Sequence, residues 1–397
     1  MARFTRTTAK AAAVAATMTL SLISGCQSTV DGSRTAENPE SRVGDSKEIL
    51  EQAFSGTTFQ APESGPPAQS GANVWLLTCI SLPSCQTIGD SFKQAAQSLG
   101  WDITELDNKL DPTTTITQIR QAVSARVDAV VVVGMDCPAI KAGLDSAKSA
   151  RIPVVSAAGA DCDDPAVGGT EQGFAATTNY LGANNATELY QLYGERNADV
   201  TVAAARESGI EAPKILDLRR PDFLSHKVQA EAFDRRVEEI CPECELIKVD
   251  YTRAQLNVPG SQLVRNTLQR HPDANVVFFP FDKMLDYGLQ TALETTNNIK
   301  LVCCGDGGGG GVEYAKKSRP QLIINAYAWG FAGYAAADTL NRLLAGDSRE
   351  QIPNMGGYIL YVEKNRNLPT VPGEQPAPPL DALKGFSDIW FPQGSGK

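Results

Sequence analysis

Short apolar runs separated by amphipathic segments dominate the chain after residue 72. The runs Val74–Ile80, Trp101–Leu106, Ala129–Val133 and Pro153–Ser156 begin 27, 28 and 24 residues apart. That spacing is the length of a strand followed by a helix, so it predicts parallel strands joined by helical crossovers. Residues 129–133 are continuously apolar, as expected of a strand that is covered on both faces.

Helix signals stand between these runs. Asp111 followed by Pro112 is a cap followed by a proline in the first turn, which predicts the start of a helix. Gly100 predicts the end of the helix before it. After the Asp-Pro pair, apolar residues recur at helical spacing, at Ile116, Ile119 and Val123.

A second series of runs continues the same alternation. Strands are expected over Lys214–Leu218, Glu245–Val249, Asn275–Phe279, Lys300–Cys304 and Leu322–Ala326. Helices are expected over Leu224–Ile240, Ser261–Arg270, Lys283–Thr295 and Phe331–Leu344. Because a single sheet of about ten strands is unusual, we expect two lobes with a boundary near residues 175–182. The predicted fold class is α/β, with doubly wound parallel-sheet lobes.

The first 26 residues carry the pattern of an export signal. Three basic residues precede an apolar stretch over residues 11–23, which fits a signal peptide and is short for a membrane-spanning helix. The sequence ISGC, which ends at Cys26, resembles the bacterial lipobox. We therefore expect a signal peptide over residues 1–25 and an acylated Cys26 that anchors the chain to the membrane. The alternative is an ordinary secretory signal.

Two further segments lack the alternation of strands and helices. Residues 26–72 are rich in Ser, Pro, Glu and Gly, which predicts a flexible tether, interrupted by a short amphipathic helix over Lys47–Phe54. Residues 365–397 are rich in proline and are expected to form an irregular tail.

The composition excludes several classes of protein. The 397 residues include 36 Lys and Arg against 46 Asp and Glu, for a formal charge of −10. An acidic chain with two histidines argues against a nucleic-acid-binding protein, which needs a basic surface. Because the only long apolar run is the N-terminal one, a protein with several membrane spans is excluded as well.

Eight cysteines follow Cys26, and an even number in an exported chain predicts disulfides. The candidate pairs are Cys79 with Cys85, Cys137 with Cys162, and Cys241 with Cys244. The last pair is a CxxC motif at the end of a predicted helix, where a structural disulfide is favoured over redox chemistry. Since no second CxxC is present, no metal site is expected. Whether Cys303 and Cys304 pair stays open.

Five stretches carry a family resemblance. They are DPTTTITQIRQAVSARVDAVVVVGMDCPAIKAGLDSAKSARIPVVSAAGADC (111–162), NYLGANNATEL (179–189), HPDANVVFFPFDKMLDYGLQTAL (271–293), LVCCGDG (301–307) and WGFAGYAAADTLNRLLAG (329–346). In order and spacing, residues 73–362 resemble type I periplasmic binding proteins of the ribose and galactose kind, the solute receptors of ABC importers. The placement of Cys and Trp is similar to an actinobacterial lipoprotein branch of sugar-binding proteins.

The resemblance implies two lobes joined by a multi-strand hinge. The N-terminal lobe would comprise residues 73–177 and 327–353, and the C-terminal lobe residues 178–326 and 354–364. The implied function is capture of a small polar ligand, a sugar or polyol, by lobe closure outside the cytoplasm, followed by delivery to an ABC permease with its ATPase. The protein would act as a monomer held by its lipid anchor. The alternative is a sensor that presents its bound form to a membrane receptor kinase.

Polar and aromatic residues at the strand ends are the candidate ligand contacts. In open parallel sheets, ligands bind beyond the carboxyl ends of the strands. Carboxylates accept pairs of hydroxyl hydrogens, arginine donates in a fixed fork, and aromatic rings cover C–H faces. The candidates are Ser84, Gln86, Asp136, Asp161, Thr177, Arg220, Asp222, Arg253, Phe281, Asp282, Asp306, Tyr327 and Trp329. Asp282 could equally cap the helix that follows it.

Several positions depart from the family pattern. The sequence LPSC (82–85) stands where ribose-type members carry Asn-Pro-Phe-Phe, AG (158–159) stands where they carry Asp-Arg, and Phe281 stands where they carry Asn. The Asp of the Asp-Gly turn is retained as Asp306. The resemblance therefore implies the location of the pocket and leaves the identity of the sugar open.

The sequence favours binding over catalysis. It contains no nucleophile elbow and no zinc-protease motif, and two histidines offer little general-base chemistry. We therefore expect no catalytic residue and no cofactor. The glycines Gly307–Gly311 lack the Lys-Ser/Thr of a phosphate-binding loop, which favours a flexible hinge or a close backbone approach to a ligand over phosphate binding.

Overall fold

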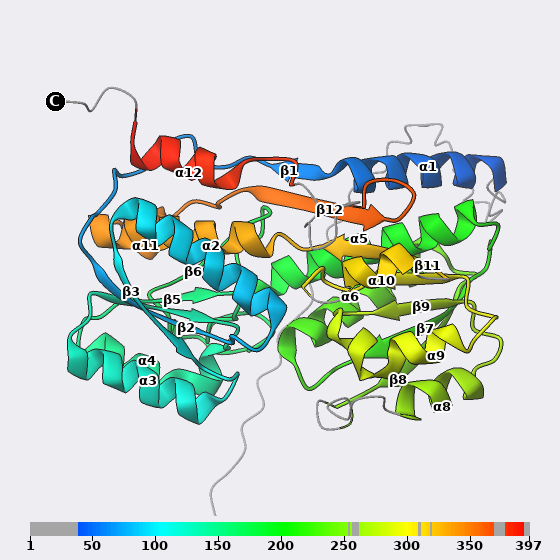
Figure 1. The fold of residues 1–397 in the computed structure, drawn as a ribbon, viewed down its shortest axis with the longest axis horizontal. Coiled ribbons are helices and arrows are strands. Elements are labelled where there is room, and N and C mark those ends of the chain that lie inside the picture. The colour runs from blue at the N-terminus through cyan, green and yellow to red at the C-terminus, as the bar shows by residue number, and fades with distance from the viewer. Residues whose placement is uncertain are drawn as a thin grey trace, which may run out of the picture. The chain divides into compact units, whose positions relative to one another are not determined.

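Two parallel sheets organise the protein (Figure 1). The computed structural model describes residues 39–252, 255, 262–308, 311–317, 320–368 and 378–392, with side chains from residue 45 onward. The signal sequence, Cys26 and Arg253 lie outside these residues. We call the five-stranded sheet with its covering helices the five-stranded lobe, and the seven-stranded sheet with its helices the seven-stranded lobe.

All strands of the five-stranded sheet run parallel. Their order is β3 (Asp102–Asp107), β2 (Asn73–Thr78), β4 (Ala129–Val133), β5 (Val154–Ala157) and β6 (Ala176–Thr177). The strands predicted from the apolar runs are thus confirmed to within a few residues, whereas the two-residue β6 was not predicted.

Helices cover both faces of this sheet. On one face lie α2 (Pro83–Leu99) and α11 (Trp329–Ala345), and on the other α3 (Pro112–Ala125) and α4 (Cys137–Ser149). In β4, Val131 packs in the cluster with α2 and α11, while Val130 and Val132 pack with α3 and α4. Alternate residues of a strand point to opposite faces, so this strand is apolar throughout because both of its faces are buried.

The seven-stranded sheet combines parallel strands with an antiparallel edge. Its order is β1 (Thr57–Phe59), β12 (Gly357–Glu363), β11 (Gln321–Ala326), β10 (Leu301–Cys304), β9 (Val276–Phe279), β7 (Lys214–Arg219) and β8 (Glu245–Asp250). The strands from β7 to β11 are parallel, whereas β12 runs antiparallel to both β11 and β1. The sequence did not predict the two antiparallel strands.

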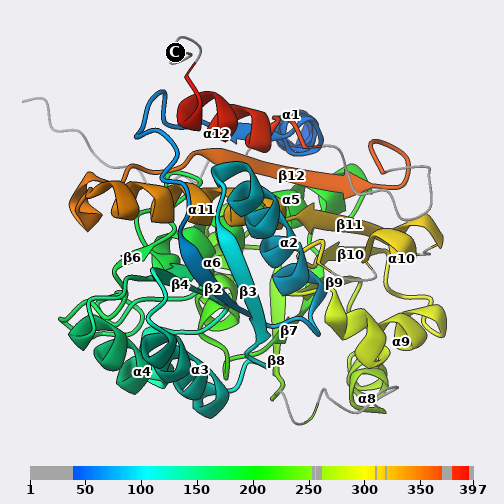
Figure 2. The same ribbon diagram turned by 60° about the vertical axis from the view of Figure 1, so that its left-hand side comes forward.

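The helices of the seven-stranded lobe again form two layers, as Figure 2 shows from a second side. Two of them, α5 (Ala186–Glu207) and α6 (Leu224–Ile240), cover one face, and α1 (Pro39–Ser55) packs on α5. The other face carries α8 (Gln262–Arg270), α9 (Gln290–Glu294) and α10 (Gly311–Lys317). Among the described residues, no helix is both long and apolar enough to cross a membrane.

Local signals explain most helix ends. The Asp111 side chain caps α3 by accepting a hydrogen bond of 2.7 Å from the Thr114 backbone N–H, as predicted. Gly100 ends α2 in the left-handed conformation, with φ of 75°. The helix predicted over residues 283–295 is interrupted instead. A π-helical turn at Leu285–Leu289 precedes α9, because Gly288 adopts a φ of 108°.

The chain passes between the two sheets at several places. It crosses after β6, after β11, before β12, and between β1 and β2. The fold is therefore the predicted α/β class, in which two parallel-sheet lobes are joined by several crossing segments.

Residues 39–72 differ from the tether that their composition predicted. They form α1 and β1, and α1 buries Leu50 and Phe54 against the seven-stranded lobe. The helix predicted over Lys47–Phe54 is part of α1. The later part of the segment is fixed by α11, because the Asn341 side chain accepts a hydrogen bond of 2.8 Å from the Gln69 backbone N–H. Polar side chains far away in the sequence thus order a stretch that lacks apolar runs.

The C-terminal segment also contains a helix that the sequence did not predict. α12 (Ala382–Trp390) packs on α11 and α2. Its Trp390 indole N–H donates a hydrogen bond of 2.8 Å to Asp338 Oδ1 of α11. Asp338 Oδ2 accepts from Arg342 Nε at 2.7 Å, and Arg342 Nη2 donates to the Ser64 carbonyl at 2.9 Å. This buried network joins both ends of the described chain to α11.

Four disulfides occur within the described residues. The predicted pairs are confirmed as Cys79–Cys85, Cys137–Cys162 and Cys241–Cys244, with Cα–Cα distances of 5.4, 5.0 and 5.3 Å. Neighbouring Cys303 and Cys304, which the sequence left open, form the fourth. The first disulfide fixes the loop between β2 and α2, one of the loops at the carboxyl ends of the strands.

We expect Asp338→Ala to destabilise the fold strongly. The substitution leaves Arg342, whose side chain is 6 % exposed, without its carboxylate partner, and breaking a buried ion pair by removing one partner costs about 3–5 kcal/mol. Equilibrium unfolding in urea measures the free energy of unfolding of the variant and of the wild type. Asp388→Ala is the control, because its pair with Lys384 is 59 % and 69 % exposed and should contribute less than about 1 kcal/mol. Equal effects of the two substitutions would contradict the role given to the network.

Candidate functional site

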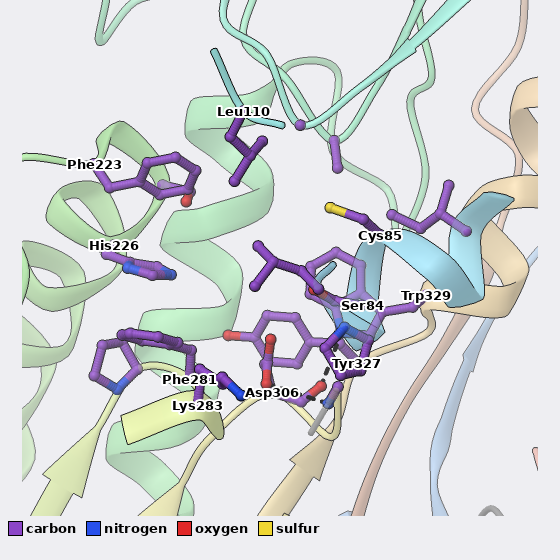
Figure 3. A pocket seen from close by; sticks show the side chains of 18 of the residues that line it. Ser84, Cys85, Leu110, Phe223, His226, Phe281, Lys283, Asp306, Tyr327 and Trp329 are labelled. Atoms are coloured by element: carbon purple, nitrogen blue, oxygen red, sulfur yellow. Dashed lines mark hydrogen bonds between the residues drawn. The ribbon is translucent and has the colours of Figure 1, made fainter. Parts of the chain in front are cut away.

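The carboxyl ends of the parallel strands in both sheets face one cavity of about 150 Å³. Loops after β2, β3, β4 and β5 approach it from the five-stranded lobe, and loops after β7, β9 and β10 from the seven-stranded lobe. An engineered protein cavity of similar volume holds a molecule the size of benzene, so this cavity suits a small molecule. Figure 3 shows the side chains around it.

The wall from the five-stranded lobe is apolar. The loop after β2 contributes Leu82, Ser84 and the disulfide-bonded Cys85, and the loop after β3 contributes Leu110. In Figure 3, Leu110 and Ser84 point toward the centre of the group from different sides. Ser84 adds a hydroxyl to a surface that otherwise offers mostly hydrocarbon.

A row of aromatic rings lines the seven-stranded side. Phe223 and His226, at the start of α6, lie 5.0 Å apart between ring centroids. His226 stacks on Phe281 at 4.7 Å with an angle of 18° between the rings. Phe281 follows β9, so a helix and a loop together build one continuous wall (Figure 3). Such rings provide flat apolar surface for the C–H face of a ligand.

Two more aromatic side chains come from the crossing after β11. Tyr327 stacks on Tyr193 of α5 at 3.7 Å, and Trp329 lies 5.2 Å from Tyr327. The Trp329 indole N–H donates a hydrogen bond of 2.9 Å to the Asp306 backbone carbonyl. The crossing segment and the loop after β10 are therefore held together beside the cavity.

Asp306 places a carboxylate at the cavity wall. Its Oδ1 accepts hydrogen bonds from the backbone N–H groups of Asp282 at 3.1 Å and of Gly308 at 3.2 Å. Burial raises the pKa of Asp306, and the hydrogen bonds from these backbone groups oppose the rise. Among the described residues, no lysine or arginine forms an ion pair with this carboxylate. The second oxygen is therefore suited to accept hydrogens from a ligand.

Two cations at the cavity are engaged by other groups of the protein. Arg220 pairs with Asp222 at 3.3 Å and lies over the rings of Phe223 and Phe281 at 5.0 and 5.5 Å. Lys283 pairs with Asp286 at 2.8 Å. The positive charges are thus balanced by exposed acids on the rim, and neither neutralises Asp306.

The structure places six of the predicted site residues at the cavity. They are Ser84, Arg220, Phe281, Asp306, Tyr327 and Trp329. Six others do not line it: Gln86, Asp136, Asp161, Thr177, Asp222 and Asp282. Arg253 lies outside the described residues. A position at the cavity wall does not show that a residue binds a ligand, so the binding role of each residue stays a prediction.

The predicted acids away from the cavity have structural partners. Asp136 Oδ1 accepts from the Ala160 backbone N–H at 2.9 Å. Asp161 accepts from the backbone N–H groups of Cys162, Gly173 and Phe174 and pairs with Arg349. These carboxylates satisfy backbone donors at strand ends, which is the reason that sequence reasoning could not separate them from ligand contacts.

The remaining residues lie beside or behind the cavity. Asp282 is buried and accepts a hydrogen bond of 3.0 Å from the Asp306 backbone N–H. Thr177 donates to Asn179 at 3.0 Å and lines a separate space of about 10 Å³. Gln86 is exposed on α2, and Asp222 is exposed on the rim, where it pairs with Arg220.

Sequence reasoning missed the lining residues that helices contribute. Tyr190 belongs to α5, while Ser225, His226 and Gln229 belong to α6. His226 lies in the first turn of α6, inside the helix predicted over Leu224–Ile240, but the sequence did not mark it as a site residue. The spacing of Phe223, His226 and Gln229 by three residues could have indicated one helix face directed at the site.

Gly307 and Gly308 lie close to neighbouring loops of the protein, whereas the predicted hinge or approach to a ligand stays a prediction. A Cβ atom on Gly308 would lie 2.8 Å from Ser84 Cβ of the other lobe, and one on Gly307 would lie 2.9 Å from Ala326 Cα. Side chains at these positions would therefore push apart the loops that close one end of the cavity.

The sequence matches the profile of the family described as "Periplasmic binding protein domain" over residues 76–348. No curated protein sequence matches the chain significantly.

Solved structures with the same fold include three sugar- or polyol-related proteins. The first is an ABC transporter solute-binding protein from Mycobacterium smegmatis with bound glycerol, 18% identical, covering 78% of this chain and 100% of that chain at a TM-score of 0.59. The second is a periplasmic ribose ABC transporter protein from Conexibacter woesei. It is 18% identical, and the match covers 76% of this chain and 95% of that chain at a TM-score of 0.55. The third is an ABC transporter periplasmic solute-binding protein from Actinobacillus succinogenes with bound D-allose. It is 16% identical, and the match covers 75% of this chain and 99% of that chain at a TM-score of 0.59.

We expect the free energy of unfolding to fall less at acidic pH in the variant His226→Phe than in the wild type. Burial, and secondly the charge of Arg220, lower the pKa of His226 to about 3, against an ordinary value near 6.5 in the unfolded chain. The contribution of neutral His226 to the free energy of unfolding is fully present above pH 6.5. It is lost as the pH falls toward 3, because in that range the imidazole binds a proton in the unfolded chain and not in the folded one.

Phenylalanine keeps the ring stack with Phe281 and cannot bind that proton. Urea unfolding at pH 7, 6, 5 and 4 should therefore show the variant gaining stability relative to the wild type as the pH falls. Parallel curves for the two proteins would show that His226 is not held neutral.

Proposed function

Because the chain belongs to the periplasmic binding protein domain family, we propose that it is the solute receptor of an ABC importer and captures a small sugar or polyol between its two lobes. Members of this family bind solutes and are not enzymes, so the protein is a receptor whose site needs only to hold and release a ligand.

The carboxylate of Asp306 is the observation that carries this proposal. It lies at the cavity wall, is fixed by two backbone N–H groups, and has no cationic partner among the described residues. A desolvated carboxylate is costly unless donors reach it, and neighbouring hydroxyls of a polyol supply two donors that fit one carboxylate. A ligand carboxylate would instead repel it.

The aromatic lining supports the same ligand class. Phe281 and Trp329 lie at the cavity on either side of Asp306 in Figure 3. Sugars and cyclic polyols combine hydroxyls with flat C–H faces, and rings next to a carboxylate match both features. The proteins of the same fold that were crystallised with glycerol and with D-allose agree with this class.

Closure of the lobes would bury the ligand. The cavity lies between residues of both lobes, and the crossing at Tyr327–Trp329 lies beside it. We assign residues 73–177 and 327–353 to one moving body and residues 178–326 and 354–364 to the other. A closed receptor would then present its occupied form to a permease.

We further propose that the receptor works as a monomer on the extracytoplasmic face of the membrane. The export pattern over residues 1–25 and the lipobox-like ISGC sequence ending at Cys26 support this. Two or more acyl chains on Cys26 would anchor the protein stably without a spanning helix.

Asp306→Asn should abolish the thermal shift that a bound sugar or polyol produces. The amide oxygen can still accept the backbone hydrogen bonds of Asp282 and Gly308, so the fold is kept, while the charge that attracts ligand hydroxyls is lost. Hydrogen bonds to a charged group contribute about 1.5–3 kcal/mol each, which corresponds to at least tenfold weaker binding. The measurement is a thermal-shift screen of sugars, polyols, amino acids and aromatic acids.

Asp136→Asn is the matched control, because it also removes a partly buried carboxylate that accepts a backbone hydrogen bond but does not line the cavity. It should leave the ligand-induced shift unchanged. If only acids without hydroxyl groups stabilise the protein, the sugar assignment is wrong; if Asp306→Asn binds as well as the wild type, the carboxylate is not in the site.

Cys26→Ala should release the protein from the membrane. The variant lacks the thiol that is acylated, and the described part of the chain has no helix that could span a membrane. Immunoblots of membrane and soluble fractions from the producing cells measure the distribution, and mass spectrometry of the N-terminal peptide detects the acyl chains. An unchanged distribution would contradict the lipid anchor.

A further inference from the structure

The polar groups of the cavity are distributed unequally between its two walls. We call the lining residues between 82 and 158 the five-stranded wall; the described side chains there are hydrocarbon at most positions, and Ser84 is the only one with a hydroxyl, amide or charge. The apolar members of this wall are Leu82, Pro83, Ile88, Leu110, Val133 and Ala158. Cys85 adds a disulfide sulfur, which is a weak acceptor. Tyr327 and Trp329 line the cavity from the crossing after β11, between the two walls, and carry a hydroxyl and an indole N–H.

The wall from the seven-stranded lobe carries most of the hydrogen-bonding groups, beside the aromatic rings of Phe223 and Phe281. Its polar lining side chains are Tyr190, Arg220, Ser225, His226, Gln229, Lys283, Tyr287 and Asp306. Gln229 is 1% exposed, and its Nε2 has no hydrogen-bond partner among the described residues. His226 Nδ1 likewise has none. Because both residues line the cavity, these two atoms are available to hydrogen-bonding groups of a ligand on this side.

A fully hydroxylated sugar fits such a cavity poorly. A hexose or pentose carries hydroxyls around its whole ring, and each needs partners once water is excluded. A hydroxyl directed at Leu82, Leu110 or Ala158 would be desolvated without a side-chain partner, which weakens binding by roughly 5- to 150-fold. A hydrogen atom or methyl group in the same place would instead gain apolar contact.

We propose that the ligand is an amphipathic sugar or polyol, which presents hydroxyls to the seven-stranded lobe and a deoxygenated or methyl-bearing side to the five-stranded lobe. The proposal rests on the proposed function and narrows its ligand class. The seven-stranded lobe would supply recognition by hydrogen bonds. The five-stranded lobe would supply exclusion of water, and it would discriminate against ligands with an additional hydroxyl.

Matched pairs of sugars test the proposal. The pairs are L-rhamnose with L-mannose, L-fucose with L-galactose, 6-deoxy-D-glucose with D-glucose, and 2-deoxy-D-ribose with D-ribose. Isothermal titration calorimetry of the wild-type protein gives the dissociation constant of each. In the pair that binds best, the deoxygenated member should bind roughly 5- to 150-fold more tightly.

The outcomes separate this proposal from the function on which it rests. If sugars bind but the fully hydroxylated member is the tighter one in every pair, the amphipathic ligand is wrong while the sugar receptor stands. If no member of any pair binds, the amphipathic sugar is overturned, and the wider screen that includes polyols and acids decides whether the receptor function stands.

The substitution Leu110→Asn should shift the ligand preference from the deoxygenated toward the hydroxylated sugar of a pair. It adds an amide to the apolar wall, and the backbone tolerates it because Leu110 has a φ of 50°, a conformation that asparagine adopts readily. The ratio of the two dissociation constants should shift at least fivefold toward the hydroxylated sugar. An unchanged ratio would show that this wall does not contact the ligand.

Two further variants keep this test decisive. Lys109→Asn is the control, because Lys109 has a similar φ of 56° in the same loop and is exposed outside the cavity; it should leave the ratio unchanged. If Leu110→Asn fails to fold, Leu82→Gln introduces an amide at a half-buried position of the same wall and should shift the ratio in the same direction.

Discussion

Two aspartates that hold each other's backbone fix the centre of the site. Asp282 Oδ1 accepts from the Asp306 N–H at 3.0 Å, and Asp306 Oδ1 accepts from the Asp282 N–H at 3.1 Å. This reciprocal pair joins the loop after β9 to the loop after β10. It thereby positions the Phe281 ring, the free oxygen of Asp306 and the approach of Gly308 to Ser84. The cavity exists because these loops are held at the ends of strands whose register is fixed by the buried sheet.

The alternation of strands and helices could be predicted from the sequence because both faces of each sheet are buried. The residues of β4 are apolar on both sides for this reason, and α6 was predicted over its observed range, Leu224–Ile240. Within residues 39–72 only the helix over Lys47–Phe54 was predicted, and α12 was not. The order of residues 64–69 and of α12 depends on contacts with Asp338, Asn341 and Arg342 of α11, which are distant in sequence and leave no periodic pattern in the segments that they fix.

The location of the cavity could be predicted from the strand ends, whereas most of its lining could not. Acids at strand ends either face the ligand or satisfy backbone N–H groups, and residue type alone does not distinguish Asp306 from Asp161. The aromatic wall was missed in part because Phe223 and His226 reach the cavity from the start of a helix. The difference between a polar and an apolar wall depends on which side chains of each lobe face inward, and that information is present only in three dimensions.

The claim that a polyhydroxy ligand binds at Asp306 between the lobes is tested most directly by a crystal structure with the sugar or polyol that stabilises the protein most. The account predicts ligand density in the cavity, with a pair of hydroxyls within hydrogen-bonding distance of the Asp306 carboxylate and a C–H face against Phe281 or Trp329. Ligand density elsewhere on the protein, with this cavity filled only by water, would contradict it.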